Sequence, residues 1–321
     1  MTHPLCVHVG LPKTATTTLQ RGLFAKHSEI EFLGKRAGRE ADPALRRCVS
    51  DAAFNLGNEL FWLHVHRSEP DESRRIWADE LAPVIDPNKL ALFSFEGLAV
   101  AELDVRKAIA RNLRDGFEGC QVIIGIRNPL ELVEALYFQK LKRRHIGKLA
   151  GRFEFSRSPS TEQWLESVAR GDELAPHLDY VRTIQIFVEA LGRANVGVFA
   201  LEDLREDPAR FATGLCEFLR INIAEGVRLL EERRHNVRLS QEVADRMLRL
   251  ERPGIASAFY GLAGRALRKK ILRLEGFDAA ASARLAISPA VKVAIEEKTR
   301  EGNRWIAEEF DLRLREYGYS V

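Results

Sequence analysis

A lysine and four threonines stand together near the amino terminus, in the stretch VHVGLPKTATTTLQ that covers residues 7–20. Gly10 ends an apolar, strand-like run, and the pattern predicts that a helix begins at Thr16. A loop that enters a helix presents unpaired backbone N–H groups, and the helix dipole favours an anion there. The Lys13 ammonium adds a full charge, and hydroxyl donors come from Thr14, Thr16, Thr17 and Thr18. These residue types predict a phosphate-type cradle.

The loop differs from the nucleotide-triphosphate loop GxxxxGK[ST], because Lys13 follows Gly10 by only three positions. This spacing disfavours a magnesium-bound triphosphate, and no aspartate that would hold magnesium stands convincingly after a strand. A small-molecule kinase that uses ATP and magnesium nevertheless remains an alternative, because it would use the same kind of anion-binding turn.

A second cation suited to a phosphate is Arg127, which directly follows the apolar run 121–126. Pro129 fits the first turn of a following helix, where its missing N–H would be unpaired in any case. A forked guanidinium at this place suits a phosphate, although it would serve equally well to bind a carboxylate.

The elements that position these residues follow from the hydrophobic pattern. Buried parallel strands are predicted by short runs rich in β-branched residues at 5–9, 90–95, 121–126 and 196–201, with helical patterns between them. This alternation predicts an α/β fold with a parallel sheet flanked by helices. We expect a single domain over residues 1–321, with 222–321 a mostly helical C-terminal portion that caps the carboxyl edge of the sheet.

The amino-acid composition limits the functions that this protein could have. The formal net charge of +3 is too small to indicate nucleic-acid binding, but it suits a small anionic ligand. The four cysteines are scattered without a CxxC pair, which favours reduced thiols. No apolar run is long enough to span a membrane and no leader pattern precedes the first strand, so we expect a cytoplasmic protein.

Two motifs resemble those of sulfotransferases that use 3′-phosphoadenosine 5′-phosphosulfate (PAPS). LPKTATTTLQ resembles their 5′-phosphosulfate loop, and VIIGIRNPLELVEALYFQ (122–139) resembles the segment that binds the 3′-phosphate. Ala15 replaces the usual glycine, and Ala135, eight positions after Arg127, replaces the usual serine. The resemblance implies a P-loop-like fold of the bacterial type and a donor site formed by Pro12, Lys13, Thr14, Ala15, Thr16, Thr17, Thr18, Arg127 and Ala135.

Two further segments resemble bacterial members of that family. They are LEDLREDPARFATGLCEFLRI (201–221) and RRHNVRLS (233–240), in which Arg233 or Arg234 could assist Arg127. The implied reaction moves a sulfuryl group from PAPS to a hydroxyl group, with Lys13 stabilising the departing phosphate oxygen. We expect no metal requirement, because no cluster of metal-ligating residues is evident. A non-catalytic nucleotide-binding protein on the same fold remains a second alternative, because of Ala15 and Ala135.

The acceptor hydroxyl must lose a proton, and two glutamates are candidate bases. Glu29, in SEIEFLGK, resembles the base of the heparan-type enzymes, and it is the first choice. Glu96 follows the run 90–95 and would lie at the carboxyl edge of the sheet, where it would position the acceptor or Lys13. His8 is predicted to be a buried core histidine, whereas His66, His145 and His235 are predicted to lie at the surface.

The acceptor itself is predicted only as a class: a carbohydrate, a glycolipid or a small metabolite with a hydroxyl group. The stretch GLAGRALRKKILRLEGF (261–277) resembles a basic amphipathic helix. Such a helix could lie on an anionic membrane and reach a glycolipid, or could simply pack its apolar stripe on a core. The sequence gives no oligomeric state.

Overall fold

The computed structural model describes residues 4–35, 70–146, 159–232, 239–252, 254–255, 259–260, 263, 265–272 and 283–321. Its contacts group into two compact units. The first unit comprises Met1–Asn128, Pro176–His235 and Thr299–Val321, and the second comprises Pro129–Ala175 and Asn236–Lys298. The single-domain organisation stays a prediction.

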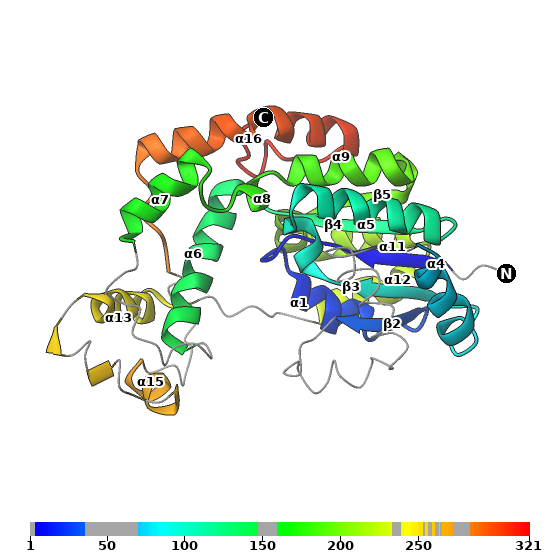
Figure 1. The fold of residues 1–321 in the computed structure, drawn as a ribbon, viewed down its shortest axis with the longest axis horizontal. Coiled ribbons are helices and arrows are strands. Elements are labelled where there is room, and N and C mark those ends of the chain that lie inside the picture. Colours follow the sequence, from blue (N-terminus) through cyan, green and yellow to red (C-terminus); the bar gives the residue numbers. More distant parts are fainter. Residues whose placement is uncertain are drawn as a thin grey trace. The chain divides into compact units, whose positions relative to one another are not determined.

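The first unit is built on a five-stranded parallel sheet (Figure 1). Its strands are β1 (Leu5–His8), β2 (Ile30–Lys35), β3 (Leu90–Ser94), β4 (Gln121–Ile126) and β5 (Val196–Ala200). They lie in the order β2-β3-β1-β4-β5, so the chain leaves the central strand β1 toward one side and later crosses to the other. The four predicted strands are confirmed. The edge strand β2 was not predicted.

Helical segments accompany the sheet of the first unit. They are α1 (Thr16–Thr18), the π-helix η1 (Leu19–Phe24), α4 (Pro70–Arg75), η3 (Ile76–Leu81), η4 (Glu96–Val100), α5 (Leu103–Gly116), α9 (Tyr180–Leu191), η6 (Arg193–Asn195), α10 (Leu201–Glu206), α11 (Pro208–Leu219) and α12 (Ile223–Glu231). Helix α9 packs on α5 and on β4 and β5, whereas α12 packs on α11 and on η1. The predicted parallel sheet flanked by helices is therefore confirmed.

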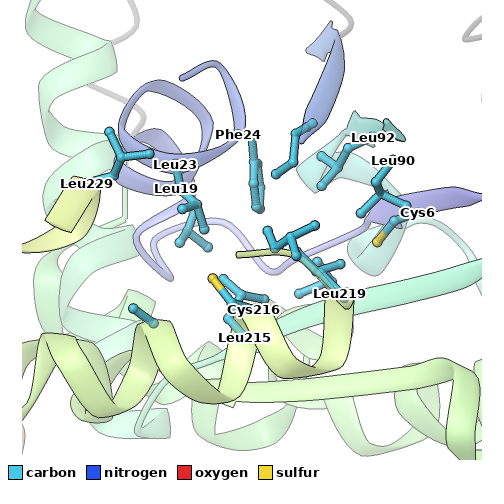
Figure 2. Close-up of a cluster of buried hydrophobic side chains, with 14 of the residues drawn as sticks. Cys6, Leu19, Leu23, Phe24, Leu90, Leu92, Leu215, Cys216, Leu219 and Leu229 are labelled. Atoms are coloured by element: carbon cyan, nitrogen blue, oxygen red, sulfur yellow. The ribbon is translucent and has the colours of Figure 1, made fainter. Parts of the chain in front are cut away.

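A hydrophobic core joins the helix after β1 to the sheet (Figure 2). Its members come from β1, η1, β3, α11 and α12, among them Cys6, Leu19, Leu23, Phe24, Leu90, Leu92, Leu215, Cys216, Leu219 and Leu229. Burial raises the pKa of the Cys120 and Cys216 thiols to about 12 and raises the pKa of the Cys6 thiol well above its ordinary value, which favours the protonated, unreactive form of all three. They are unbridged, as predicted, and Cys48 lies outside the described residues.

The second unit is helical in its described part. It contains α6 (Pro129–Ile146), α7 (Thr161–Arg170), α13 (Gln241–Glu251) and α15 (Arg265–Ile271), while α8 (Ala175–Leu178) and α16 (Pro289–Phe310) each have residues in both units. Within residues 222–321, most of the described positions are helical. In α15 the side chains do not follow a simple amphipathic pattern, because Arg268 is only 2% exposed while Leu267 is 53% exposed. The Arg268 guanidinium donates to the Tyr260 carbonyl oxygen and lies over the Tyr260 ring.

His145 was predicted to lie at the surface, and this is wrong. The side chain is buried near the end of α6, with Nδ1 3.1 Å from the Tyr260 hydroxyl group. Burial, followed by the charges of Arg144 and Arg268, lowers the pKa of His145 to about 4. Glu251 lies 3.8 Å from Nε2, but Arg144 pairs with the same carboxylate and offsets its charge.

This burial predicts acid sensitivity of folding. The unfolded chain takes up a proton at His145 near the ordinary pKa of 6.5, whereas the folded chain does so only near 4. Stability is therefore complete above the ordinary pKa and is lost as the pH falls toward 4, by up to about 1.4 kcal/mol for each pH unit. The unfolding temperature of the wild type should fall more steeply between about pH 7 and pH 5 than that of His145→Gln. Equal slopes would contradict the assignment.

Candidate active site

The loop after β1 runs beside β4 and is hydrogen-bonded to it. The Val9 N–H donates to the Ile123 carbonyl oxygen at 3.0 Å, and the Leu11 N–H donates to the Gly125 carbonyl oxygen at 3.4 Å. The Thr14 hydroxyl group donates to the Leu11 carbonyl oxygen at 2.6 Å. Thr14 therefore closes the loop on itself, and its hydroxyl proton is used in this internal hydrogen bond.

The loop backbone uses left-handed conformations that glycine adopts most easily. Lys13 has a φ of 72° and Ala15 a φ of 61°. The resemblance places a glycine at position 15, and an alanine that adopts this conformation costs about 1–2 kcal/mol. The alanine therefore strains the turn without preventing it.

The turn leads directly into the helical segment α1–η1, with Ala15 at the N-cap and without a side-chain cap. Lys13 and Thr17 are exposed there, whereas Thr16 and Thr18 are buried. Because no side chain caps the first turn, its backbone N–H groups suit an anion, and an exposed ammonium and hydroxyl group stand beside them. These residues fit the 5′-phosphosulfate end of a PAPS-type donor.

Arg127 lies against this loop. It follows β4, its side chain is buried, and its Nη1 donates to the Lys13 carbonyl oxygen at 3.3 Å. Two segments more than a hundred residues apart in sequence therefore meet at the carboxyl edge of the sheet, which is where open α/β sheets bind ligands. The two predicted phosphate-binding cations come from segments that are in direct contact.

Gly125 is a residue of this site that the sequence interpretation missed. A Cβ at this position would lie 2.8 Å from Thr14 Oγ1 and 3.4 Å from the Thr14 carbonyl oxygen, so the loop packs on the bare backbone of β4. A glycine inside a strand often marks such a close approach, and this was the available signal.

We expect Gly125→Ala to displace the loop. An added methyl group in a packed interior typically costs about 1–3 kcal/mol, and here the strain falls on the turn that carries Lys13. Thermal unfolding should show the lost stability, and calorimetry should show weaker binding of adenosine 3′,5′-bisphosphate. Gly214→Ala is the matched control, because nothing lies within 4 Å of a Cβ on that helical glycine. Unchanged nucleotide affinity in Gly125→Ala would contradict the expectation.

A row of hydrogen-bonded, buried polar side chains lies beside the loop and ends at Glu96. His8 Nδ1 lies 2.7 Å from Ser94 Oγ, and Gln20 Nε2 donates to the same oxygen at 2.8 Å. Gln20 Nε2 also lies 3.5 Å from Glu96 Oε1. The predicted burial of His8 is confirmed, and its ring packs against Phe24.

The structure separates Glu29 from this edge. Glu29 precedes β2 at the amino end of the sheet, and its Oε2 accepts a hydrogen bond from the Asn222 N–H at 2.6 Å. The Lys13 loop follows the opposite, carboxyl end of β1. Glu29, the first choice as base, is therefore not brought together with the Lys13 loop, because SEIEFLGK leads into a parallel edge strand. Glu96, which directly follows β3 with Phe95, lies at the carboxyl edge instead.

The C-terminal segment contacts Asn128, the residue that follows Arg127. The sequence did not indicate this contact. The Asn128 side-chain amide donates to the Tyr317 and Gly318 carbonyl oxygens at 3.2 and 3.0 Å. The Glu202 carboxylate accepts from the Asn128 N–H and from the Tyr319 hydroxyl group, both at 3.0 Å. Burial raises the pKa of Glu202, and these two donors partly oppose that effect.

The remaining predicted residues are placed as follows. Pro12 is half-buried in the loop, and Ala135 is a half-buried residue of α6 in the second unit. Arg233, Arg234, His66 and His235 lie outside the described residues. Within the described ranges there is no group of three His, Cys, Asp or Glu side chains that could hold a metal ion. No helix in the described part of the chain is long and apolar enough to cross a bilayer.

Comparison with known proteins gives matches among solved structures only, because no protein-family model and no curated sequence matches significantly. A sulfotransferase from Alicyclobacillus acidocaldarius is similar with a TM-score of 0.50 and 14% identity, over 99% of this chain and 100% of that one. A sulfotransferase domain from the curacin biosynthetic pathway gives a TM-score of 0.42 at 14% identity, over 92% of this chain and 96% of that one.

The parallel sheet, with an anion-type loop after its central strand, places the chain in the class of P-loop-like α/β proteins. Within that class it has the sulfotransferase fold, because the Alicyclobacillus enzyme matches it along nearly its whole length. The resemblance noted in two short motifs is thereby confirmed at the level of the fold.

Proposed function

We propose that the protein transfers a sulfuryl group from a PAPS-type donor to the hydroxyl group of a small-molecule or glycan acceptor. The observation that carries the proposal is the contact between the Arg127 guanidinium and the Lys13 carbonyl oxygen at the carboxyl edge of the sheet. A donor with anionic groups at both ends needs one cationic side chain for each end, and both must come from the same edge of the sheet. The sulfotransferase fold supports the same proposal.

The proposal assigns roles to Lys13, Arg127 and Glu96. The uncapped helix start and Lys13 bind the 5′-phosphosulfate, and Lys13 stabilises the charge that grows on the oxygen between sulfur and phosphorus. Arg127 binds the 3′-phosphate at the other end of the nucleotide. Glu96 accepts the acceptor proton as the new O–S bond forms and the S–O bond to phosphate breaks. The products are a sulfate ester and adenosine 3′,5′-bisphosphate.

The test is ligand stabilisation with matched nucleotides. A ligand that binds only the folded state raises its unfolding temperature by mass action. Adenosine 3′,5′-bisphosphate should therefore stabilise the protein more than 5′-AMP, which lacks the phosphate assigned to Arg127, and more than ATP with magnesium. Stronger stabilisation by ATP with magnesium would favour the kinase alternative. Bisphosphate binding without transfer to any of a broad set of hydroxyl acceptors would favour a non-catalytic role.

Peripheral membrane contact through residues 261–277 also remains a proposal. Leu267 and Ile271 are exposed on α15, and Lys270 is exposed beside them. Apolar and cationic side chains on one surface suit an anionic bilayer. Sedimentation with vesicles that contain phosphatidylserine, compared with neutral vesicles, tests this contact.

A further inference from the structure

We propose that Gln20, held by the buried Ser94–His8 pair, positions the Glu96 carboxylate for proton transfer. The inference rests on the proposed function, because it assigns Glu96 the part of the base. It deepens that proposal by naming a residue that acts through Glu96 and does not touch the donor or the acceptor.

The orientation of the Gln20 amide follows from its neighbours. An ionised carboxylate can only accept hydrogen bonds, so the Gln20 nitrogen faces Glu96, and the reversed amide would bring two acceptors together. The same nitrogen lies 2.8 Å from Ser94 Oγ. Its two protons therefore point to two different acceptors, Ser94 Oγ and Glu96 Oε1.

The hydrogen bonds among Gln20, Ser94 and His8 hold the Gln20 amide in place. Ser94 Oγ accepts from Gln20 and also lies 2.7 Å from His8 Nδ1, with the His8 tautomer deciding which of the two groups donates in that second bond. Ser94 and His8 are fully buried, and Gln20 is nearly so, which means that water does not compete for these bonds. Both backbones are fixed as well, since His8 and Ser94 are register partners in neighbouring strands.

The contact to Glu96 is the longest of the three, at 3.5 Å. Hydrogen bonds of catalytic groups are often long without substrate and shorten when the reacting complex forms. Glu96 is also the most exposed member, because it is half-buried where the others are buried. This row of hydrogen-bonded side chains is therefore held rigidly in the interior. It ends at the Glu96 carboxylate, at the carboxyl edge of the sheet.

The experiment compares Gln20→Met with Gln121→Met. Gln121 also makes one part-buried side-chain bond, to the Phe218 carbonyl oxygen at 3.0 Å, but it lies at the amino end of β4. Because Gln20→Met removes a hydrogen bond to a charged group, we expect it to lower kcat by about tenfold to a hundredfold. The KM for the donor and the affinity for adenosine 3′,5′-bisphosphate should stay within about twofold, and Gln121→Met should keep kcat.

A double-mutant cycle separates positioning from a merely structural role. If Gln20 acts through Glu96, then Gln20→Met should slow the wild type but should not slow Glu96→Gln further. Equal factors in both backgrounds, or a loss of bisphosphate affinity that parallels the loss of kcat, would overturn the proposal.

The same cycle can be measured without an acceptor, which keeps the two proposals distinguishable. Changes in unfolding temperature for the two single variants and the double variant should not add, because the side chains interact directly. Additive changes would overturn the role of Gln20 whether or not the protein transfers sulfate. Absence of transfer by the wild type would instead count against the proposed function.

Discussion

Lys13→Met should nearly abolish sulfuryl transfer while the protein still binds adenosine 3′,5′-bisphosphate. Lys13 is exposed in the loop between β1 and α1, beside the uncapped start of the helix. Its ammonium is assigned to charge that develops only as the S–O bond to phosphate breaks. Removal of one such donor typically lowers kcat by about a hundredfold to a thousandfold, and the ground state loses much less. Steady-state kinetics, with calorimetry of the bisphosphate, measure both quantities.

Lys26→Met is the matched control for this change. Lys26 is an exposed lysine two residues after the end of η1, at the opposite end of this helical segment from its uncapped start. It should retain the kcat of the wild type. A Lys13→Met protein with full kcat would exclude Lys13 from the reaction. A loss of bisphosphate affinity as large as the loss of kcat would show that Lys13 only binds the nucleotide.

Much of the sheet was predictable because buried parallel strands are continuous apolar runs. The strands β1, β3, β4 and β5 are of this kind, and the predicted bounds of each agree with the observed ones to within one residue. The strand β2 was missed because it lies at the edge of the sheet and its sequence includes the charged residues Glu31 and Lys35. Because this strand was missed, the sequence did not indicate that Glu29, which precedes it, lies at the amino end of the sheet.

The candidate site was predictable where its chemistry is local in sequence. The loop around Lys13 and the arginine after β4 each stand out within a few residues, because a strand-to-helix turn shows its own pattern. The contacts that support them connect distant segments. Gln20 meets Ser94 across 74 positions, and Asn128 meets Gly318 across 190, so no local pattern could indicate either pair.

Glu96→Gln should lower kcat strongly and leave donor binding intact. Glu96 begins the turn after β3, next to the edge that carries the Lys13 loop, and its Oε1 faces the Gln20 amide. A glutamine keeps the shape of the side chain but cannot take a proton. General-base catalysis typically contributes about a hundredfold to ten-thousandfold, so a loss of that size is expected in kcat. The affinity for adenosine 3′,5′-bisphosphate should be unchanged, because the acceptor proton is not part of donor binding.

Glu29→Gln makes this test decisive between the two glutamates. The Glu29 carboxylate accepts the Asn222 N–H at the start of α12, at the amino end of the sheet, and a glutamine oxygen can replace it there. Its kcat should therefore equal that of the wild type, with at most a small loss of stability. If Glu29→Gln were the inactive variant and Glu96→Gln the active one, the reacting hydroxyl group would have to lie at the amino edge of the sheet. The loop of Lys13 and the guanidinium of Arg127 would then have no part in the reaction, because both lie at the opposite edge.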